Sequence, residues 1–124
     1  MRRILVAEDD LALRTLYRVW LERDGYDVTD VADGRAALDE LESGPLPDAA
    51  LLDVDMPRVD GLSVCRYLTA RAPGIPVVIA TGVDGIETEA FAAGAAAVVA
   101  KPCGHEDVVR TLARVSAPRL RAAS

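Results

Sequence analysis

Five short apolar runs, separated by segments of helical periodicity, constrain the fold more than any other feature of this sequence. Four of them are continuously apolar, which is typical of strands buried on both faces of a parallel sheet. The second run is mixed in polarity and suits an edge strand. The runs are ILVA at 4–7, DVTDV at 27–31, AALLD at 49–53, PVVIA at 76–80 and AAVVA at 96–100.

The segments that follow these runs carry apolar residues at helical spacing. Asp10 and Asp33 are placed to cap the first two helices. The alternation is therefore (βα)₅, which predicts a parallel sheet with right-handed crossovers. The helical residues are Leu13, Leu16, Tyr17 and Trp20; Ala37, Leu38 and Leu41; Val64, Cys65 and Leu68; Glu87 to Ala93; and Val108, Val109, Leu112 and Val115.

Length and charge narrow the class of protein. The chain has 124 residues, enough for one domain with one core, and a formal net charge of −6, which argues against nucleic-acid binding by this domain. No apolar run approaches the roughly 20 residues of a membrane-spanning helix. Cys65 and Cys103 are isolated, without metal-ligand spacing, and we interpret them as reduced thiols of a cytoplasmic protein.

Chemically active side chains collect where the predicted strands end. In an open α/β sheet, ligands bind beyond the carboxyl ends of the strands. Glu8 and Asp9 follow the first strand, Asp53 ends the third, Thr81 follows the fourth, and Lys101 follows the fifth. Lys101 is the only lysine of the chain; all other basic residues are arginines. We therefore expect acids, a hydroxyl and an ammonium to meet at one edge of the sheet.

Three close carboxylates repel one another unless protons or a cation neutralise them. Their oxygen ligands suit a hard ion, and Mg²⁺ is favoured when a phosphate group shares the site. The alternative is that acidic residues merely flank strands as turn residues, and for Asp10 we prefer a capping role. For Glu8 and Asp9, the position of Asp53 opposite them on a second strand favours the metal site.

The order of five motifs makes the chain resemble the receiver domain of two-component response regulators. The motifs are ILVAEDD, LLDVDMPRVDG, PVVIATG, EAFAAGA and AKP, and the resemblance covers residues 3 to 116. It implies a flavodoxin-like, doubly wound five-stranded parallel sheet of strand order 2-1-3-4-5. We expect residues 1–116 to form the receiver domain and residues 117–124 a short flexible tail or the start of a linker.

The resemblance also implies a site and a reaction. Asp53 would be the phosphoacceptor, with Thr81 and Lys101 contacting the phosphoryl group. The Lys101–Pro102 bond is expected to be cis, with the lysine aimed at Asp53. The implied Mg²⁺ ligands are Glu8, Asp9, Asp53 and the backbone carbonyl of Asp55.

The implied function is a phosphorylation-activated switch rather than an enzyme acting on a separate substrate. A histidine kinase or histidine phosphotransfer protein would supply the phosphoryl group, and the domain would catalyse only its own phosphorylation and dephosphorylation. The output would be a conformational change passed to an effector protein or domain, with a phosphorylation-dependent homodimer as a further option. The resemblance points to a bacterial, cytoplasmic protein that binds neither nucleic acid nor membranes through this domain.

Four positions depart from the family or carry no predicted role in the chemistry. Val98 stands where many receivers have a tyrosine or phenylalanine that moves on activation. Cys103 is expected to be a small buried hydrophobe, and His105 to be exposed in the first turn of the last helix, without catalytic work. Trp20 is expected to pack in the core.

Other classes of protein share some of these features. A phosphorylation-independent interaction module would keep the fold, and the loss of the aromatic at Val98 favours it slightly. A haloacid-dehalogenase-like phosphatase also uses an Asp-x-Asp motif, but on its first strand, whereas Asp53 lies on the third. A flavodoxin-like flavin binder would need a phosphate-cradling loop after the first strand, where the acidic sequence EDDLALR would repel phosphate.

Overall fold

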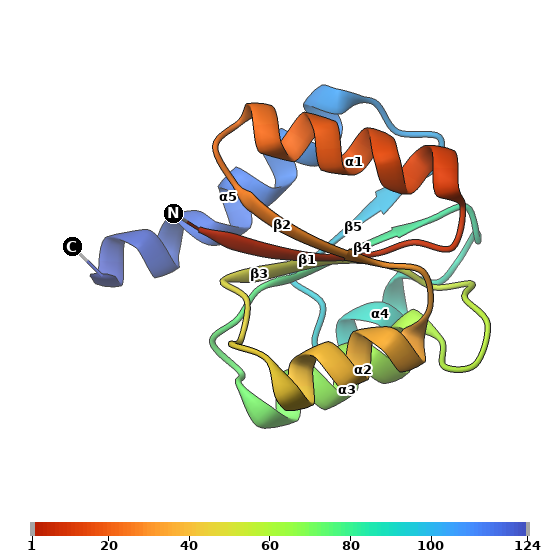
Figure 1. The fold of residues 1–124 in the computed structure, drawn as a ribbon. Coiled ribbons are helices and arrows are strands. Elements are labelled where there is room, and N and C mark those ends of the chain that lie inside the picture. The colour runs from red at the N-terminus through yellow and green to blue at the C-terminus, as the bar shows by residue number, and fades with distance from the viewer. Residues whose placement is uncertain (1, 124) are drawn as a thin grey trace.

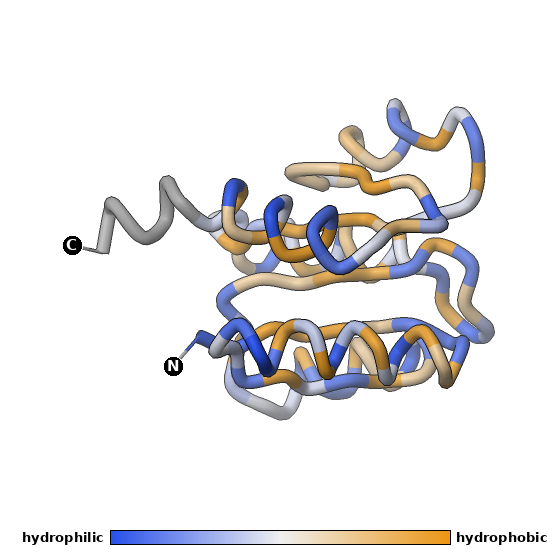
Figure 2. The backbone as a smooth tube through the Cα atoms, turned by 90° about the horizontal axis from the view of Figure 1, so that it is seen from above, coloured by the Kyte–Doolittle hydropathy of each residue, from blue (hydrophilic) through white to orange (hydrophobic). Residues whose placement is uncertain are grey.

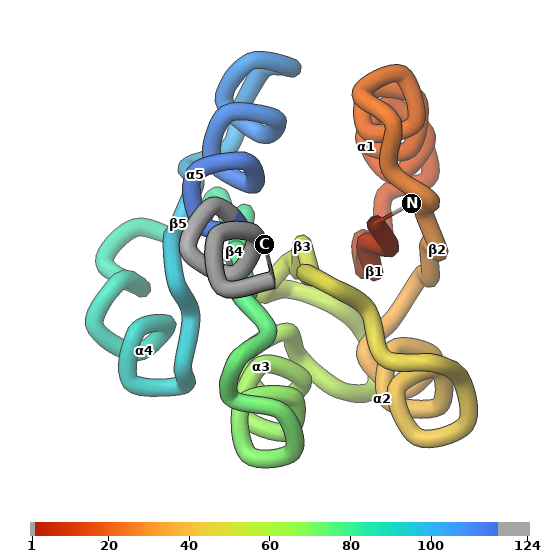
Figure 3. The backbone as a smooth tube through the Cα atoms, turned by 90° about the vertical axis from the view of Figure 1, so that its left-hand side faces the viewer, coloured from red at the N-terminus to blue at the C-terminus, as the bar shows by residue number. Residues whose placement is uncertain are grey.

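The computed structural model describes the backbone of residues 2–123 and the side chains of residues 2–116. Five parallel strands form one sheet in the order β2-β1-β3-β4-β5, which confirms the predicted fold class. Figure 3 looks nearly along the strands, so that this order can be followed across the picture. The elements are β1 Arg3–Ala7, α1 Leu11–Arg23, β2 Asp27–Val31, α2 Gly34–Ser43, β3 Ala49–Asp53, α3 Gly61–Arg71, β4 Val77–Thr81, α4 Glu87–Ala92, β5 Ala97–Ala100 and α5 His105–Ala123.

The helices cover both faces of the sheet in three layers. Helices α1 and α5 lie on one face, and α2, α3 and α4 lie on the other (Figure 1). Strands β3 and β4 are buried along their whole length, whereas the edge strand β2 is buried only at Val28. This difference explains why the central runs are continuously apolar and the second run is not. All five predicted strands lie within one residue of their observed bounds.

Apolar and polar residues alternate along the helical turns, which Figure 2 shows in orange and blue, and each of the helices α1 to α4 buries part of its surface. The predicted caps are confirmed, because Asp10 and Asp33 accept bonds from the backbone N–H groups of Leu13 and Ala36. The helical spacing put Leu16 on one apolar stripe with Tyr17 and Trp20, but Leu16 is 46% exposed. The face of α1 that meets the core is rotated, and it buries Leu21 instead.

The last helix is longer than expected. Helix α5 runs from His105 to Ala123 and so continues past residue 116, where we expected a flexible tail. The backbone of the expected tail is therefore helical as far as residue 123, and the domain boundary at 116 stays a prediction. Within residues 2–123, no helix combines the length and apolar character needed to cross a bilayer.

A close backbone contact holds the end of β3 in place. The loop after β3 turns back so that α3 begins at Gly61, whose N–H donates to the carbonyl oxygen of Val54 at 3.1 Å. A Cβ added to Gly61 would lie 1.8 Å from the carbonyl oxygen of Asp53, far inside van der Waals contact. Only a residue without a side chain fits here, and its packing fixes the backbone of Asp53.

Gly61→Ala should therefore destabilise the protein by about 3 kcal/mol, because the backbone of Asp53 or of α3 must shift to admit a methyl group. The control is Gly74→Ala, since a Cβ at Gly74 would meet no atom within 4 Å. Chemical denaturation of both variants measures the difference. Equal stability of the two would contradict the close packing of Gly61 on Asp53.

Candidate functional site

Five predicted site residues meet at the carboxyl edge of the sheet. Glu8 and Asp9 follow β1, Asp53 ends β3, Thr81 ends β4, and Lys101 follows β5. Carboxylate oxygens of Glu8, Asp9 and Asp53 lie within 4.8 Å of one another. Glu8 and Asp53 are buried, with 1% and 6% exposure, whereas Asp9 is exposed. The strand ends therefore create a cluster of three acids that is open to solvent only at Asp9.

The ammonium of Lys101 bridges two of these acids. Its Nζ lies 2.5 Å from Oε1 of Glu8 and 3.3 Å from Oδ1 of Asp53. The Lys101–Pro102 peptide bond is cis, and both this bond and the approach of the lysine to Asp53 were predicted. The shorter contact to Glu8 was not predicted. Lys101 is thus shared between a carboxylate on β1 and a carboxylate on β3.

The site raises the pKa of Asp53 to about 7. Burial is the largest cause, and the negative charge of Glu8 adds to it, while Lys101 acts in the opposite direction. Lys101 itself is affected by burial, which lowers its pKa, but the contacts with Glu8 and Asp53 outweigh burial and raise the pKa overall. The lysine therefore stays charged at neutral pH, and Asp53 holds its proton to a higher pH than an ordinary aspartate does.

The charge of the cluster suits a divalent cation. Three carboxylates and one ammonium leave two uncompensated negative charges when Asp53 is ionised. All the side-chain donors are carboxylate oxygens, which suit the hard ion Mg²⁺. The residues present therefore fit the predicted metal. Asp55, whose carbonyl was predicted as a further ligand, is exposed in the loop after β3, and that role stays a prediction.

Thr81 lies at the same edge of the sheet, at the end of β4. It is 3% exposed, and its hydroxyl oxygen accepts a bond from the backbone N–H of Val83 at 3.0 Å. The hydroxyl proton is left to donate to another oxygen. The carbonyl oxygen of Thr81 accepts a bond from the backbone N–H of Lys101 at 2.8 Å, so the ends of β4 and β5 are tied together beside the acids.

A second group of side chains joins α1 to the chain that follows Lys101. Tyr17, buried at 1% exposure, has its hydroxyl 3.6 Å from Sγ of Cys103. Trp20 packs on Tyr17 and on His105, with ring centroids 5.9 Å and 5.8 Å away. Cys103 is only partly buried, less than expected, whereas His105 is exposed at the start of α5 as predicted. Burial, the contact with Cys103 and the nearby acids raise the pKa of Tyr17, so it stays neutral.

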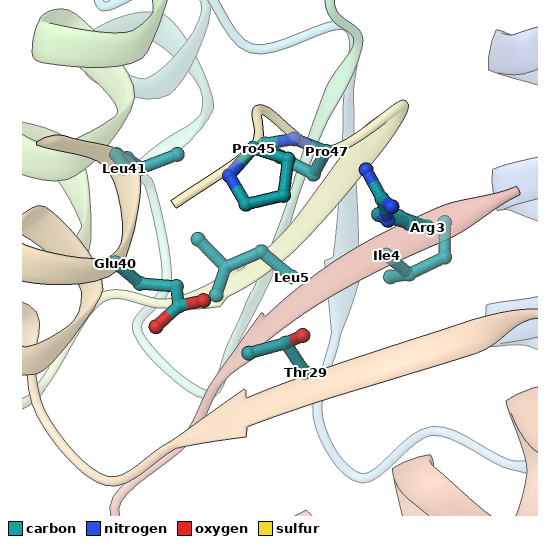
Figure 4. Close-up of a pocket in the computed structure, with 8 residues that line it drawn as sticks. All are labelled: Arg3, Ile4, Leu5, Thr29, Glu40, Leu41, Pro45 and Pro47. Carbon is teal, nitrogen blue, oxygen red and sulfur yellow. The ribbon is translucent and has the colours of Figure 1, made fainter. Parts of the chain in front are cut away.

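A separate hollow lies at the other end of the strands, near the start of β1 and the end of α2 (Figure 4). Its walls are mainly apolar, and none of its residues belongs to the acidic cluster. It is lined by Arg3, Ile4, Leu5, Thr29, Glu40, Leu41, Pro45 and Pro47. The hollow and the acidic cluster are therefore separate places on the molecule.

Comparison with known proteins agrees with the geometry. Residues 4–113 match the family of response regulator receiver domains. This chain belongs to that family. It is 40% identical to the response regulator MprA of Mycolicibacterium vanbaalenii and to that of Mycobacterium avium, over 94% of its own length. The chain spans about half the length of these curated relatives, 52% and 53% respectively.

Solved structures resemble the whole receiver fold. The CheY-like receiver domain protein of Methanospirillum hungatei superposes with a TM-score of 0.92 and 25% identity, covering 98% of both chains. The receiver domain of the sensor histidine kinase PA1611 of Pseudomonas aeruginosa has a TM-score of 0.83 and 32% identity, covering 94% of this chain and 98% of the other. That structure holds a magnesium ion in its active-site cleft.

The raised pKa of Asp53 gives a prediction for the metal-free protein. Between about pH 4 and pH 7 the folded state binds more protons at Asp53 than the unfolded state, whose aspartate has a pKa near 3.8. Stability should therefore fall as the pH rises through this range. Asp53→Asn removes the titration, so in EDTA it should be more stable than wild type at pH 8, by about 1 to 3 kcal/mol, and less so at pH 4.

Denaturation curves of the two proteins at both pH values measure this effect. Asp48→Asn is a control carboxylate, because Asp48 lies before β3, outside the acidic cluster. A stability difference between wild type and Asp53→Asn that does not change with pH would show that Asp53 is ionised throughout.

Proposed function

We propose that Asp53 is the phosphoacceptor of this receiver domain and that its phosphorylation requires Mg²⁺ held by Glu8, Asp9 and Asp53. The observation that carries the proposal is the juxtaposition of three carboxylates with one ammonium at the ends of β1, β3 and β5. The metal-bound receiver of P. aeruginosa supports it, being 32% identical to this chain. The backbone carbonyl of Asp55 is proposed as a further ligand.

The chemistry needs alignment and charge neutralisation more than covalent assistance. A carboxylate oxygen of Asp53 forms a bond to phosphorus, while the bond from phosphorus to the donor's leaving atom breaks and that atom keeps the electron pair. When bound, Mg²⁺ supplies positive charge to the carboxylates and to the oxygens of the phosphoryl group. Lys101, already 3.3 Å from Asp53, lies close enough to pair with one of those oxygens.

The proposed donor is a histidine kinase or a histidine phosphotransfer protein, as in the two-component systems to which this family belongs. The protein that holds this domain would then relay the signal to an effector protein or effector domain. Phosphorylation-dependent pairing of two receivers is one form that the output could take. Residues 1–116 would act as the receiver, and residues 117–124 would lead out of it.

A phosphorylation-independent interaction module is the second candidate. The observation in its favour is Val98, which is partly buried against the apolar core and cannot swing as a large aromatic ring would. Against it stands the complete set of charged groups around Asp53, which an interaction module would not need. The two candidates differ in whether the protein can be phosphorylated at all.

Incubation with Mg²⁺ and acetyl phosphate should add one phosphoryl group to the wild-type protein, detected as a mass increase of the intact chain. Asp53→Asn should abolish the increase, because the nucleophilic oxygen is lost, and EDTA should prevent it in wild type. Asp48→Asn is the matched control and should be phosphorylated normally. Phosphorylation of Asp53→Asn would move the acceptor elsewhere, and an unmodified wild type that binds Mg²⁺ would favour the interaction module.

The Lys101→Arg variant should fold, but its phosphorylation should produce only a weak structural change in the rest of the domain. A guanidinium is wide and planar and prefers two coplanar acceptors, so it would pair with Glu8 and Asp53 in place of the compact ammonium. In wild type, the largest phosphorylation-dependent change in amide hydrogen exchange is expected in residues 81–94, which include Gly85 at φ +75°, a backbone conformation that glycine adopts readily.

The same exchange experiment on Lys101→Arg should show a much smaller change in residues 81–94. The control is Arg66→Lys, which exchanges arginine and lysine at an exposed position on α3 and should behave like wild type. A normal response of Lys101→Arg would mean that positive charge alone is sufficient. A larger wild-type change in α1 or α2 would place the output surface elsewhere.

A further inference from the structure

A chain of polar contacts joins β2 to the backbone of Glu8. Arg14, on the first turn of α1, donates from Nη1 to the carbonyl oxygen of Glu8 at 3.0 Å. Its Nε lies 3.2 Å from Oδ2 of Asp30 on β2, and the two side chains are only 16% and 21% exposed. One guanidinium therefore binds two different elements through two different nitrogens, in a place that solvent reaches poorly.

Arg18 provides a contrast one turn further along α1. It also binds Asp30, through its Nη1, and its Nε lies 3.4 Å from Oε2 of Glu22. Its side chain is 45% exposed. Within residues 2–116, Arg14 is the arginine whose side chain forms a hydrogen bond with Glu8. Two arginines thus share one aspartate, but they differ in whether they touch the first acid of the site.

The place of this contact is where β1 leaves the sheet. The N–H of Glu8 donates to the carbonyl oxygen of Val31 at 3.1 Å, just past the last paired residues of β1 and β2. From there the chain passes through Asp9 and Asp10 into α1. The guanidinium of Arg14 binds the next carbonyl, so it holds the chain at the point from which the carboxylates of Glu8 and Asp9 project.

We propose that Arg14, anchored by Asp30, is a positioning residue for the Mg²⁺ site. It fixes the peptide that carries Glu8 and Asp9 and thereby preorganises their carboxylates for the ion, as groups behind the direct ligands do in metal sites. The inference rests on the proposed function, because it takes Glu8 and Asp9 to be metal ligands. It adds two residues, Arg14 and Asp30, that lie outside the acidic cluster.

Electrostatics alone makes the opposite prediction. A positive charge near three carboxylates repels a divalent cation, so removing the charge of Arg14 would strengthen Mg²⁺ binding if position did not matter. If the guanidinium of Arg14 orients the carboxylates of Glu8 and Asp9, however, removing it would weaken Mg²⁺ binding. The sign of the change in affinity therefore separates positioning from charge.

The test is isothermal titration calorimetry of Mg²⁺ into the folded, unphosphorylated protein. We expect Arg14→Gln to bind about tenfold more weakly than wild type, at the lower end of the range for groups that orient metal ligands. Arg14→Lys should also bind Mg²⁺ weakly, since one ammonium cannot make both contacts that the guanidinium makes through Nη1 and Nε. Arg18→Gln, which removes the same charge from the same aspartate, should bind like wild type.

A readout without metal accompanies the titration. The N–H of Asp10 donates to Oε2 of Glu8 at 3.1 Å, so loosening of this turn should speed its hydrogen exchange in EDTA. We expect faster exchange of the Asp10 amide in Arg14→Gln and in Asp30→Asn, but not in Arg18→Gln. Thermal melts of each variant confirm that it is folded and show any general loss of stability, which a purely structural role would produce without changing the affinity.

Several outcomes would overturn the inference. Unchanged or tighter Mg²⁺ binding by Arg14→Gln would show that the contact does not position the ligands. Wild-type affinity in Arg14→Lys would show that the two-nitrogen contact is not what positions the ligands, and equal weakening in Arg18→Gln would assign the effect to the Asp30 network as a whole. If the wild type itself bound no Mg²⁺, the proposed function would fail together with the inference, whereas the other outcomes leave the function intact.

Discussion

The buried carboxylate of Glu8 is the constraint on which the arrangement of the site depends. A charged group that is 1% exposed is tolerated only when its polar atoms are satisfied. Here Oε1 contacts Lys101 at 2.5 Å, and Oε2 accepts a bond from the N–H of Asp10 at 3.1 Å. The backbone of the same residue is bound to Val31 and Arg14. Contacts with β2, α1 and the end of β5 therefore converge on one residue.

This arrangement leaves the negative charge of the neighbouring Asp53 only partly compensated. Lys101 is shared, and its shorter contact is to Glu8, so Asp53 experiences burial and a nearby negative charge that one ammonium does not offset. The result is a carboxyl group with a pKa of about 7, which costs folding free energy at higher pH. Such a cost is typical of functional sites, where local stability is sacrificed for chemistry. A bound cation would remove it.

The fold and most of the site could be predicted from the sequence because each depends on local pattern. Continuous apolar runs fix the strands, and the residue at each strand end then follows from the topology. What could not be predicted depends on how a helix is rotated on the sheet and on which side chains from different elements come into contact. Leu16 has helical spacing but lies on the solvent side of α1. The hydrogen bonds from Arg14 to Glu8 and between Tyr17 and Cys103 join residues that no sequence pattern links. The continuation of α5 past residue 116 was also not predicted.

The departure at Val98 affects how a signal could leave the site. Val98 packs in the same core cluster as Ile86 and Ala90, which belong to the segment around α4. Thr81 and Lys101 are joined by a backbone bond of 2.8 Å at the ends of β4 and β5. A group that pulled on the Thr81 hydroxyl would therefore act on the chain between Thr81 and α4, which includes Gly85 at a positive φ. Because a valine fills less space than an aromatic ring, α4 could shift against β5 without expelling a large side chain, so the response would be carried by backbone and helix movement rather than by a rotamer change.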